Sequence, residues 1–332
     1  MTSVPTSRNG VILSQIAPIA WEHPADRAAL QSLRAVPGFD EVIRKIVGFF
    51  GERGIRLLFQ ANAVRVGPKQ FPELHMMLVE ACTTMDWPDM PEFYVTQTPI
   101  VNAAAVGVDH PFIIINSGAV ELLDADELRV IIGHELGHVM SGHALYRTVL
   151  IILLELGFQN LPFLAGLALL PVKLALLEWY RKSELSVDRA SLLASQDPRA
   201  SMRLFLKLAG GGQTDQMDLD TFLVQAKEYE DKGGALDTIY KILNTLGITH
   251  PFATLRAAEL QRWIEAGSYD RIIRGEYPRR GTEQEKRPLG DDVEEAVDYY
   301  TREARETFKG VTDAVKRAAD GVSQAFRDAT KR

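Results

Sequence analysis

His134-Glu135-Leu136-Gly137-His138 is the stretch from which the rest of this sequence is interpreted. The two histidines are four positions apart, so on a helix they share one face and both imidazoles can bind one cation. Glu135 stands at the position from which a carboxylate can take a proton from a metal-bound water. The spacing therefore predicts a helix that carries two metal ligands and a general base.

The sequence around the motif favours a buried helix. Asp124-Ala125-Asp126-Glu127 places acidic side chains in a first turn, which suits a helix N-terminus. Apolar residues then recur at Leu128, Ile131, Ile132, Leu136, Val139 and Met140. Two histidines and a glutamate are costly to bury without partners, so a metal ion is their natural partner. A chance match to a short motif is the competing interpretation, and this context counts against it.

A catalytic metal site needs a third protein ligand and an open fourth position. Glu184 and Asp188 are four residues apart on an expected second helix, residues 174–193. We assign Glu184 as the third ligand and Asp188 as the carboxylate that orients a ligating imidazole through its free N–H. The alternative is a solvent-exposed acidic helix face.

Two other residues are set aside as ligands. Cys82, the single cysteine, lies in an apolar helical segment and is expected in the core. His143 follows His138 by five residues, so it is expected to turn away from the motif face at the end of the helix.

The motif and the segment Trp179-Tyr180-Arg181-Lys182-Ser183-Glu184-Leu185-Ser186-Val187-Asp188-Arg189-Ala190 together resemble the HtpX and CAAX-prenyl-protease family of gluzincin zinc endopeptidases. The family's second element often ends Ala-Asp, where this chain has Val187-Asp188. Thr249-His250-Pro251, with Arg256 six residues beyond His250, is similar to a family His-Pro followed by Arg on the substrate side of the zinc. The resemblance covers about residues 92–260. It implies one catalytic Zn²⁺, peptide-bond hydrolysis, and His250 or Arg256 as a donor to the oxyanion.

A short strand is expected at residues 100–106 and a second at 111–116. In gluzincins an edge strand beside the active helix pairs with the substrate backbone, and Asn102-Ala103 resembles the Asn-Ala of that strand. The resemblance implies that Asn102, Ala103 and Ala104 bind an extended peptide by strand addition. An ordinary hairpin over the core is the alternative.

Composition bounds the class of protein. The chain has 332 residues, 46% of them hydrophobic and 24% charged, which is typical of a globular protein. A net charge of −7 argues against general nucleic-acid binding. One cysteine excludes an internal disulfide and fits a reducing compartment. The first residues lack the pattern of a signal peptide, so a cytoplasmic location, with membrane association as an extension, is expected.

We predict an α+β, predominantly helical fold with a small sheet beside the active-site helix. Residues 1–90 are expected to form a mostly helical region packed on the catalytic core, with one strand at residues 63–66. The catalytic domain is expected at 91–277, a linker at 278–292, and a long amphipathic helix at 293–332.

The apolar segment 148–177 decides the expected relation to a membrane. A span needs about 20 uninterrupted apolar residues, and Glu155, Gln159, Asn160 and Pro162 divide this segment. We expect a helical hairpin that is buried or dips into a bilayer face. Residues 148–177, and separately the amphipathic segment 293–329, are the candidate contacts with a membrane or a partner. The expected substrate is a peptide or unfolded protein. One alternative is a membrane-associated quality-control protease. The other is a non-proteolytic zinc-binding or chaperone-like module; an intact Glu135 argues against this second alternative, because a structural site needs no base.

Overall fold

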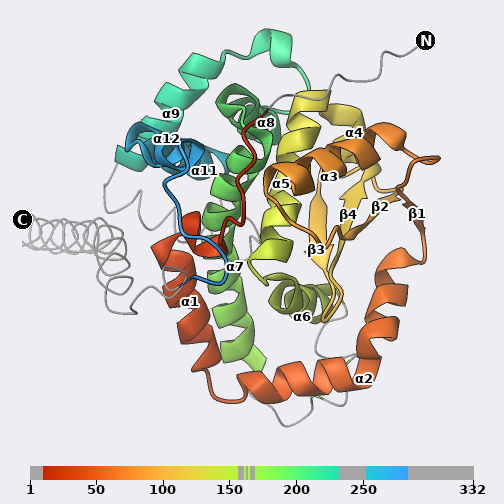
Figure 1. Cartoon of the computed structure of the whole chain (residues 1–332). Helices are drawn as coiled ribbons and strands as arrows, with labels where there is room; N and C mark the ends of the chain where they lie inside the picture. Colours follow the sequence, from red (N-terminus) through yellow and green to blue (C-terminus); the bar gives the residue numbers. More distant parts are fainter. Residues whose placement is uncertain (1–9, 156–160, 162–163, 165–168, 232–251, 283–332) are drawn as a thin grey trace, which may run out of the picture.

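The computed structural model describes residues 10–155, 161, 164, 169–231 and 252–282 (Figure 1). Over these residues the chain is mostly helical with a small mixed sheet, which confirms the predicted class. The helices are α1 (Pro24–Arg34), α2 (Phe39–Gln60), α3 (Pro72–Thr84), α4 (Ser117–Leu122), α5 (Ala125–Met140), α6 (Ala144–Glu155), α7 (Leu169–Ser195), α8 (Pro198–Gly210), α9 (Leu219–Asp231), α11 (Ala253–Glu265) and α12 (Ser268–Ile273), with 3-10 helices at Pro18–Ala20 and Thr214–Gln216. The helix expected at 293–332 and most of the expected linker lie outside the described residues.

Helix α5 begins at a capping box. Asp124 Oδ1 accepts hydrogen bonds from the amides of Asp126 and Glu127, each at 3.0 Å. In return, Glu127 Oε2 accepts from the Asp124 amide at 2.9 Å, so each of these three amides has an acceptor. Every residue from Glu127 to Met140 is buried, which places the H-E-x-x-H motif inside the molecule.

Helix α5 ends in a Schellman motif. The His143 amide donates to the His138 carbonyl at 3.0 Å, and the Gly142 amide donates to the Val139 carbonyl at 3.1 Å. Gly142 has a φ of +69°, the left-handed conformation that this ending requires and that glycine adopts without strain. The chain then bends by 103° into α6, so His143 comes back over the last turn of α5.

Helix α7 lies directly against α5, and two glycines permit the close approach. A Cβ atom at Gly133 would lie 2.8 Å from Ala194 Cβ, and one at Gly137 would lie 2.7 Å from Ala190 Cβ. Carbon atoms in contact are normally about 3.5–4.0 Å apart, so α5 can approach this closely only without side chains at these positions. Each glycine immediately precedes a motif histidine, and the tight helix contact therefore lies beside the imidazoles.

The sheet has the strand order β1-β2-β4-β3, formed by β1 (Ala63–Arg65), β2 (Glu92–Thr96), β3 (Ala103–Val106) and β4 (Phe112–Asn116). β2 and β4 are parallel, and the other two pairs are antiparallel. β3 is an edge strand, and it lies on the side of the sheet nearest α5 and α6 (Figure 1). This arrangement places the sheet on one side of α5, with α7 on the other and α1 beyond α7.

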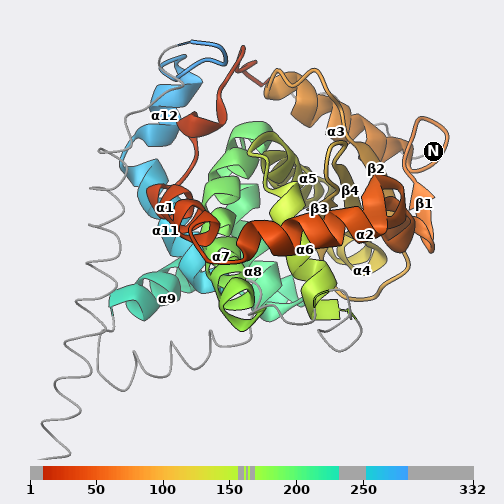
Figure 2. The ribbon, with the colours of Figure 1, turned by 90° about the horizontal axis from the view of Figure 1, so that it is seen from below.

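A second apolar cluster joins α2, α6 and the first half of α7, and Figure 2 shows α2 lying across α6. Of residues 148–177, the part described as α6 is mostly buried, whereas Leu170 and Leu174 at the beginning of α7 are exposed. Among the described helices, none alone has the length and apolar content of a membrane span, and α5 with α6 meets that test only as a bent pair.

Candidate metal centre

His134 and His138 from α5 meet Glu184 from α7, and one ligand atom of each lies within 4.8 Å of the others. His138 Nε2 is 3.2 Å from Glu184 Oε1, and His134 Nε2 is 3.4 Å from Glu184 Oε2. Glu184 is fully buried, and its Oε2 accepts no hydrogen bond. Arg256 Nη1, 3.2 Å away, balances part of the charge on this oxygen, and a bound cation would supply the direct contact that the oxygen lacks. Two imidazoles and a carboxylate are also a donor set that Zn²⁺ takes, so the residues fit a metal ion.

Asp188 and Arg256 support this group from behind. Asp188 Oδ1 lies 3.2 Å from His134 Nδ1, which leaves His134 Nε2 facing Glu184. Arg256 donates to Asp188 through Nε at 2.8 Å and through Nη2 at 2.5 Å, and its Nη1 lies 3.2 Å from Glu184 Oε2. Arg256 is itself buried, and its guanidinium group contacts both carboxylates. His250, the other expected oxyanion donor, lies outside the described residues.

The charges around the site suit metal ligands. Burial, reinforced by the nearby charge of Arg147, lowers the pKa of His138 well below its usual value, so this imidazole is neutral. Burial would raise the pKa of Glu184, but Arg256 and His134 outweigh it and hold that pKa well below its usual value. For His134, burial opposes protonation, but Glu184 and Asp188 prevail and raise the pKa to about 9. A bound cation would therefore displace a proton from His134.

Glu135 is held between the edge strand and α6. Its Oε2 accepts a hydrogen bond from the Ala105 amide at 2.6 Å and another from Arg147 Nη1 at 2.6 Å. Arg147 Nη2 in turn donates to Tyr180 Oη at 3.1 Å. Both Glu135 and Arg147 are buried. One oxygen of the carboxylate is thus fixed by two donors, and sequence spacing gave no indication of Arg147.

The edge strand presents alternate residues to α5 and α6. The Asn116 amide donates to the Asn102 carbonyl, so by the alternation of an antiparallel ladder the peptide groups of Ala104 also pair with β4. Those of Ala103 and Ala105, which are buried residues, point away from β4 toward Arg147 and Glu135. The Ala103 carbonyl accepts from Arg147 Nη2 at 3.5 Å. Asn102, Ala103 and Ala104 were expected to bind the substrate backbone, but among these only Ala103 has peptide groups that point away from β4. Ala105, which was not expected, has the same orientation.

The expectation that His143 turns away from the motif is wrong. Its Nδ1 lies 3.1 Å from His138 Nδ1 and its Nε2 lies 3.4 Å from Asp26 Oδ2, in α1. Burial, with a contribution from Arg147, lowers the pKa of His143 to about 3. Helical spacing misplaced this residue because α5 has already ended at Met140.

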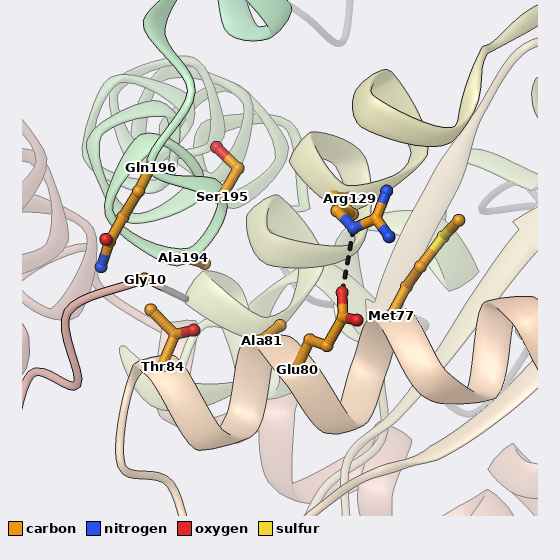
Figure 3. A pocket seen from close by; sticks show the side chains of 9 residues that line it. All are labelled: Gly10, Met77, Glu80, Ala81, Thr84, Arg129, Ala194, Ser195 and Gln196. Atoms are coloured by element: carbon orange, nitrogen blue, oxygen red, sulfur yellow. Dashed lines mark hydrogen bonds and ion pairs between the residues drawn. The ribbon is translucent and has the colours of Figure 1, made fainter. Parts of the chain in front are cut away.

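The pocket in Figure 3 is separate from this group. It lies between α3, α5 and the end of α7, with a volume of about 30 Å³, and Arg129 donates to Glu80 beside it at 2.9 Å. That volume is enough for about one water molecule. A larger pocket of about 520 Å³ lies beside β1 and β2. Neither pocket is lined by a residue of the metal-binding group.

Two histidines on one helix, a carboxylate on the next, and a glutamate beside an edge strand form a site of the metal-dependent peptidase type. The family model "Peptidase family M48" matches residues 68–264. That span is more than half of the chain, and the chain belongs to peptidase family M48.

Curated relatives agree with this family. The "Plastoglobule-localized metallopeptidase 48, chloroplastic" of Arabidopsis thaliana is 34% identical over 260 residues, which are 76% of this chain and 75% of that protein. A "Protease HtpX homolog" of Pseudarthrobacter chlorophenolicus is 29% identical over 227 residues, 60% of this chain and 75% of that protein. Another from Moorella thermoacetica is 32% identical over 95 residues, 28% of this chain and 31% of its own. No solved structure matches the chain significantly.

Proposed function

We propose that this metallopeptidase is a zinc-dependent endopeptidase in which His134, His138 and Glu184 bind one Zn²⁺ and Glu135 is the general base. The observation that carries the proposal is the buried Glu184 carboxylate, which faces two imidazoles and has one oxygen without a hydrogen bond. An intact glutamate next to the first histidine favours a catalytic site over a structural zinc site, because a structural site needs no base.

The chain's own residues supply the proton chemistry. Zinc, when bound, supplies a Lewis acid that acidifies water and polarises a peptide carbonyl. Arg147 and the Ala105 amide hold Glu135 Oε2, so Oε1 is the atom left to take the proton of the attacking water. The same carboxyl group then returns the proton to the leaving amine. We retain His250 as a candidate donor to the oxyanion, whereas the contacts of Arg256 favour a role in holding Asp188 and Glu184.

The proposed substrate is an extended peptide or an unfolded protein segment. A peptide would add to the edge strand β3 through the peptide groups of Ala103 and Ala105 that point away from β4, which gives affinity with little dependence on sequence. Arg147 and Glu135 now occupy one peptide group of each residue. A substrate strand therefore has to displace these side chains or pair with the peptide groups that they leave open.

We propose membrane association, the extension of the expected cytoplasmic location, in the form of contact with a lipid surface. One relative's name places it at plastoglobules. In this chain Leu170 and Leu174 expose large apolar side chains at the beginning of α7. Sedimentation of the full chain with and without phospholipid vesicles, compared with a Leu170→Ser/Leu174→Ser variant, tests this placement. Equal sedimentation of the two proteins would exclude these residues as the contact.

Zinc content and casein cleavage, measured on the same variants, test the proposed function. We expect Glu135→Gln to retain zinc and lose cleavage, because only the base is removed. Glu184→Ala is expected to lose zinc, and Asp188→Ala to bind it about tenfold more weakly or worse, because an imidazole loses its orienting partner. Glu178→Gln is the matched control, because this half-exposed glutamate on α7 pairs with Arg181 rather than with the site. Parental cleavage by Glu135→Gln would refute the mechanism.

A further inference from the structure

A buried chain of side chains leads from His138 to α1. His138 Nδ1 lies 3.1 Å from His143 Nδ1, and His143 Nε2 lies 3.4 Å from Asp26 Oδ2. His143 and Asp26 are each only 2% exposed, and neither belongs to the metal-binding group. Asp26 also precedes residue 68, where the family match begins. The chain of contacts therefore connects the motif to a segment that the family model does not cover.

One arrangement of protons satisfies both contacts and leaves a nitrogen for a metal ion. If His138 Nε2 is to bind a metal ion beside Glu184, the single proton of the neutral imidazole has to be on Nδ1, which then donates to His143. His143 accepts on Nδ1, and its own proton is then on Nε2, which faces Asp26. Asp26 Oδ2 is an acceptor in this arrangement. The opposite direction would place a proton on His138 Nε2 and remove it as a ligand.

Helix α7 fixes the position of Asp26. Ser186 Oγ donates to Asp26 Oδ2 at 2.6 Å, and the His23 amide donates to Ser186 Oγ at 2.8 Å. Ser186 lies between Glu184 and Asp188 on the same helix. Helix α7 thus supplies a ligand to the site and also holds the far end of the chain of contacts, with α1 packed along it (Figure 1).

We propose that Asp26 and His143 are positioning residues that hold the His138 imidazole with Nε2 free to bind the metal ion, so that α1 is part of the metal centre. This inference rests on the metal site of the proposed function. Partners of ligating histidines commonly contribute about 10–100-fold to metal affinity. Here the partner is itself a histidine, and its Nε2 lies 3.4 Å from the buried carboxyl group of Asp26.

The test measures the zinc dissociation constant of the full chain by competition with a chelating dye. We expect His143→Leu and Asp26→Leu each to weaken binding by about 10–100-fold. Asp26→Asn and His143→Gln retain hydrogen-bonding groups and are expected to stay closer to the parent. Because Asp26 acts through His143, the double Leu variant is expected to bind zinc no more weakly than His143→Leu alone.

A packing control separates this role from the stability of α1. Leu33→Ala removes a fully buried side chain of α1 that packs in the cluster of α2 and α6. It is expected to lower the melting temperature while leaving zinc affinity unchanged. The proposal is overturned if zinc affinity in Asp26→Leu stays within about twofold of the parent, if the two Leu substitutions are additive, or if Leu33→Ala weakens zinc as much.

Two further comparisons keep the outcome decisive. If Asp26→Leu does not fold, the contrast between His143→Leu and His143→Gln tests the same hydrogen bond, and equal zinc affinities would contradict the proposal. Glu184→Ala reports on the metal site itself. Parental affinity in Glu184→Ala would refute the proposed zinc site, whereas loss of zinc in Glu184→Ala with parental affinity in His143→Leu would refute only the positioning role.

Discussion

Substitution of Gly137 by alanine tests whether the close contact of α5 and α7 builds the metal centre. The new Cβ would lie 2.7 Å from Ala190 Cβ, against about 3.5–4.0 Å for carbons in contact, so the helices would have to separate by about 1 Å. Such overpacking costs about 1–3 kcal/mol. Alanine itself favours a helix over glycine by about 1 kcal/mol. We therefore expect a net loss of stability of about 0–2 kcal/mol.

The effect on metal binding is expected to be larger than the effect on stability. Metal–ligand distances tolerate about 0.2 Å, and a separation of about 1 Å moves Glu184 away from His138. Zinc affinity is expected to fall by about tenfold or more, measured by chelator competition, with unfolding followed in urea. Ala190→Gly in the same protein removes the clashing Cβ and is expected to restore zinc affinity.

Gly48→Ala provides the matched control for the helix preference of alanine. Gly48 lies within α2, and a Cβ there would meet no atom within 4 Å, so the substitution is expected to stabilise the protein by up to about 1 kcal/mol. The reasoning is refuted if Gly137→Ala stabilises the protein as Gly48→Ala does and leaves zinc affinity unchanged.

Two further predictions concern the charges around the site. The pKa of His134 is raised to about 9, so the metal-free protein carries a proton there at pH 7 and zinc has to displace it. The loss of this one proton is expected to raise zinc affinity about tenfold per pH unit between about pH 7 and 9. Chelator competition across that range measures the slope, and a flat profile would contradict this protonation state. Arg147→Met leaves the Glu135 carboxylate buried without its cation and is expected to cost about 3–5 kcal/mol in urea unfolding of the metal-free protein. Arg65→Met is the control, because Arg65 pairs with Glu92 and its side chain is 62% exposed; this substitution is expected to cost about 1 kcal/mol or less. Similar losses in the two variants would argue against a buried ion pair between Arg147 and Glu135.

The parts of the site that were predicted from the sequence are those set by helical spacing. His134 with His138, and Glu184 with Asp188, are each four residues apart, and each pair lies on one face of a helix as expected. That these faces meet was implied by the family resemblance, because no local signal says which helices pack together. Gly133, which precedes His134 on a buried helix, is a local signal of close approach that helical spacing alone does not interpret.

Other parts depended on where a helix ends or on contacts between distant segments. His143 was misplaced because helical spacing was carried past Gly142, although glycine after an apolar helical run commonly marks a C-terminus. Arg147 follows that turn and contacts Glu135 only because α6 bends back toward the edge strand. Asp26 lies in a segment with no motif at all, and its place beside His143 is a product of tertiary packing.

Helix α7 also shows why an E-x-x-x-D pattern here is not a solvent-exposed acidic face. Glu184 and Asp188 share the face that meets the motif histidines and Arg256 in α11, whereas Ser186 contacts Asp26 in α1. Every residue of α7 from Lys182 to Asp188 is buried, so the carboxylates in this segment have to be balanced by charges inside the protein. Arg256 balances part of that charge, and the proton on His134 or a bound cation balances the rest. Because the proton and the cation satisfy the same carboxylate, metal binding at this site is coupled to the protonation of His134.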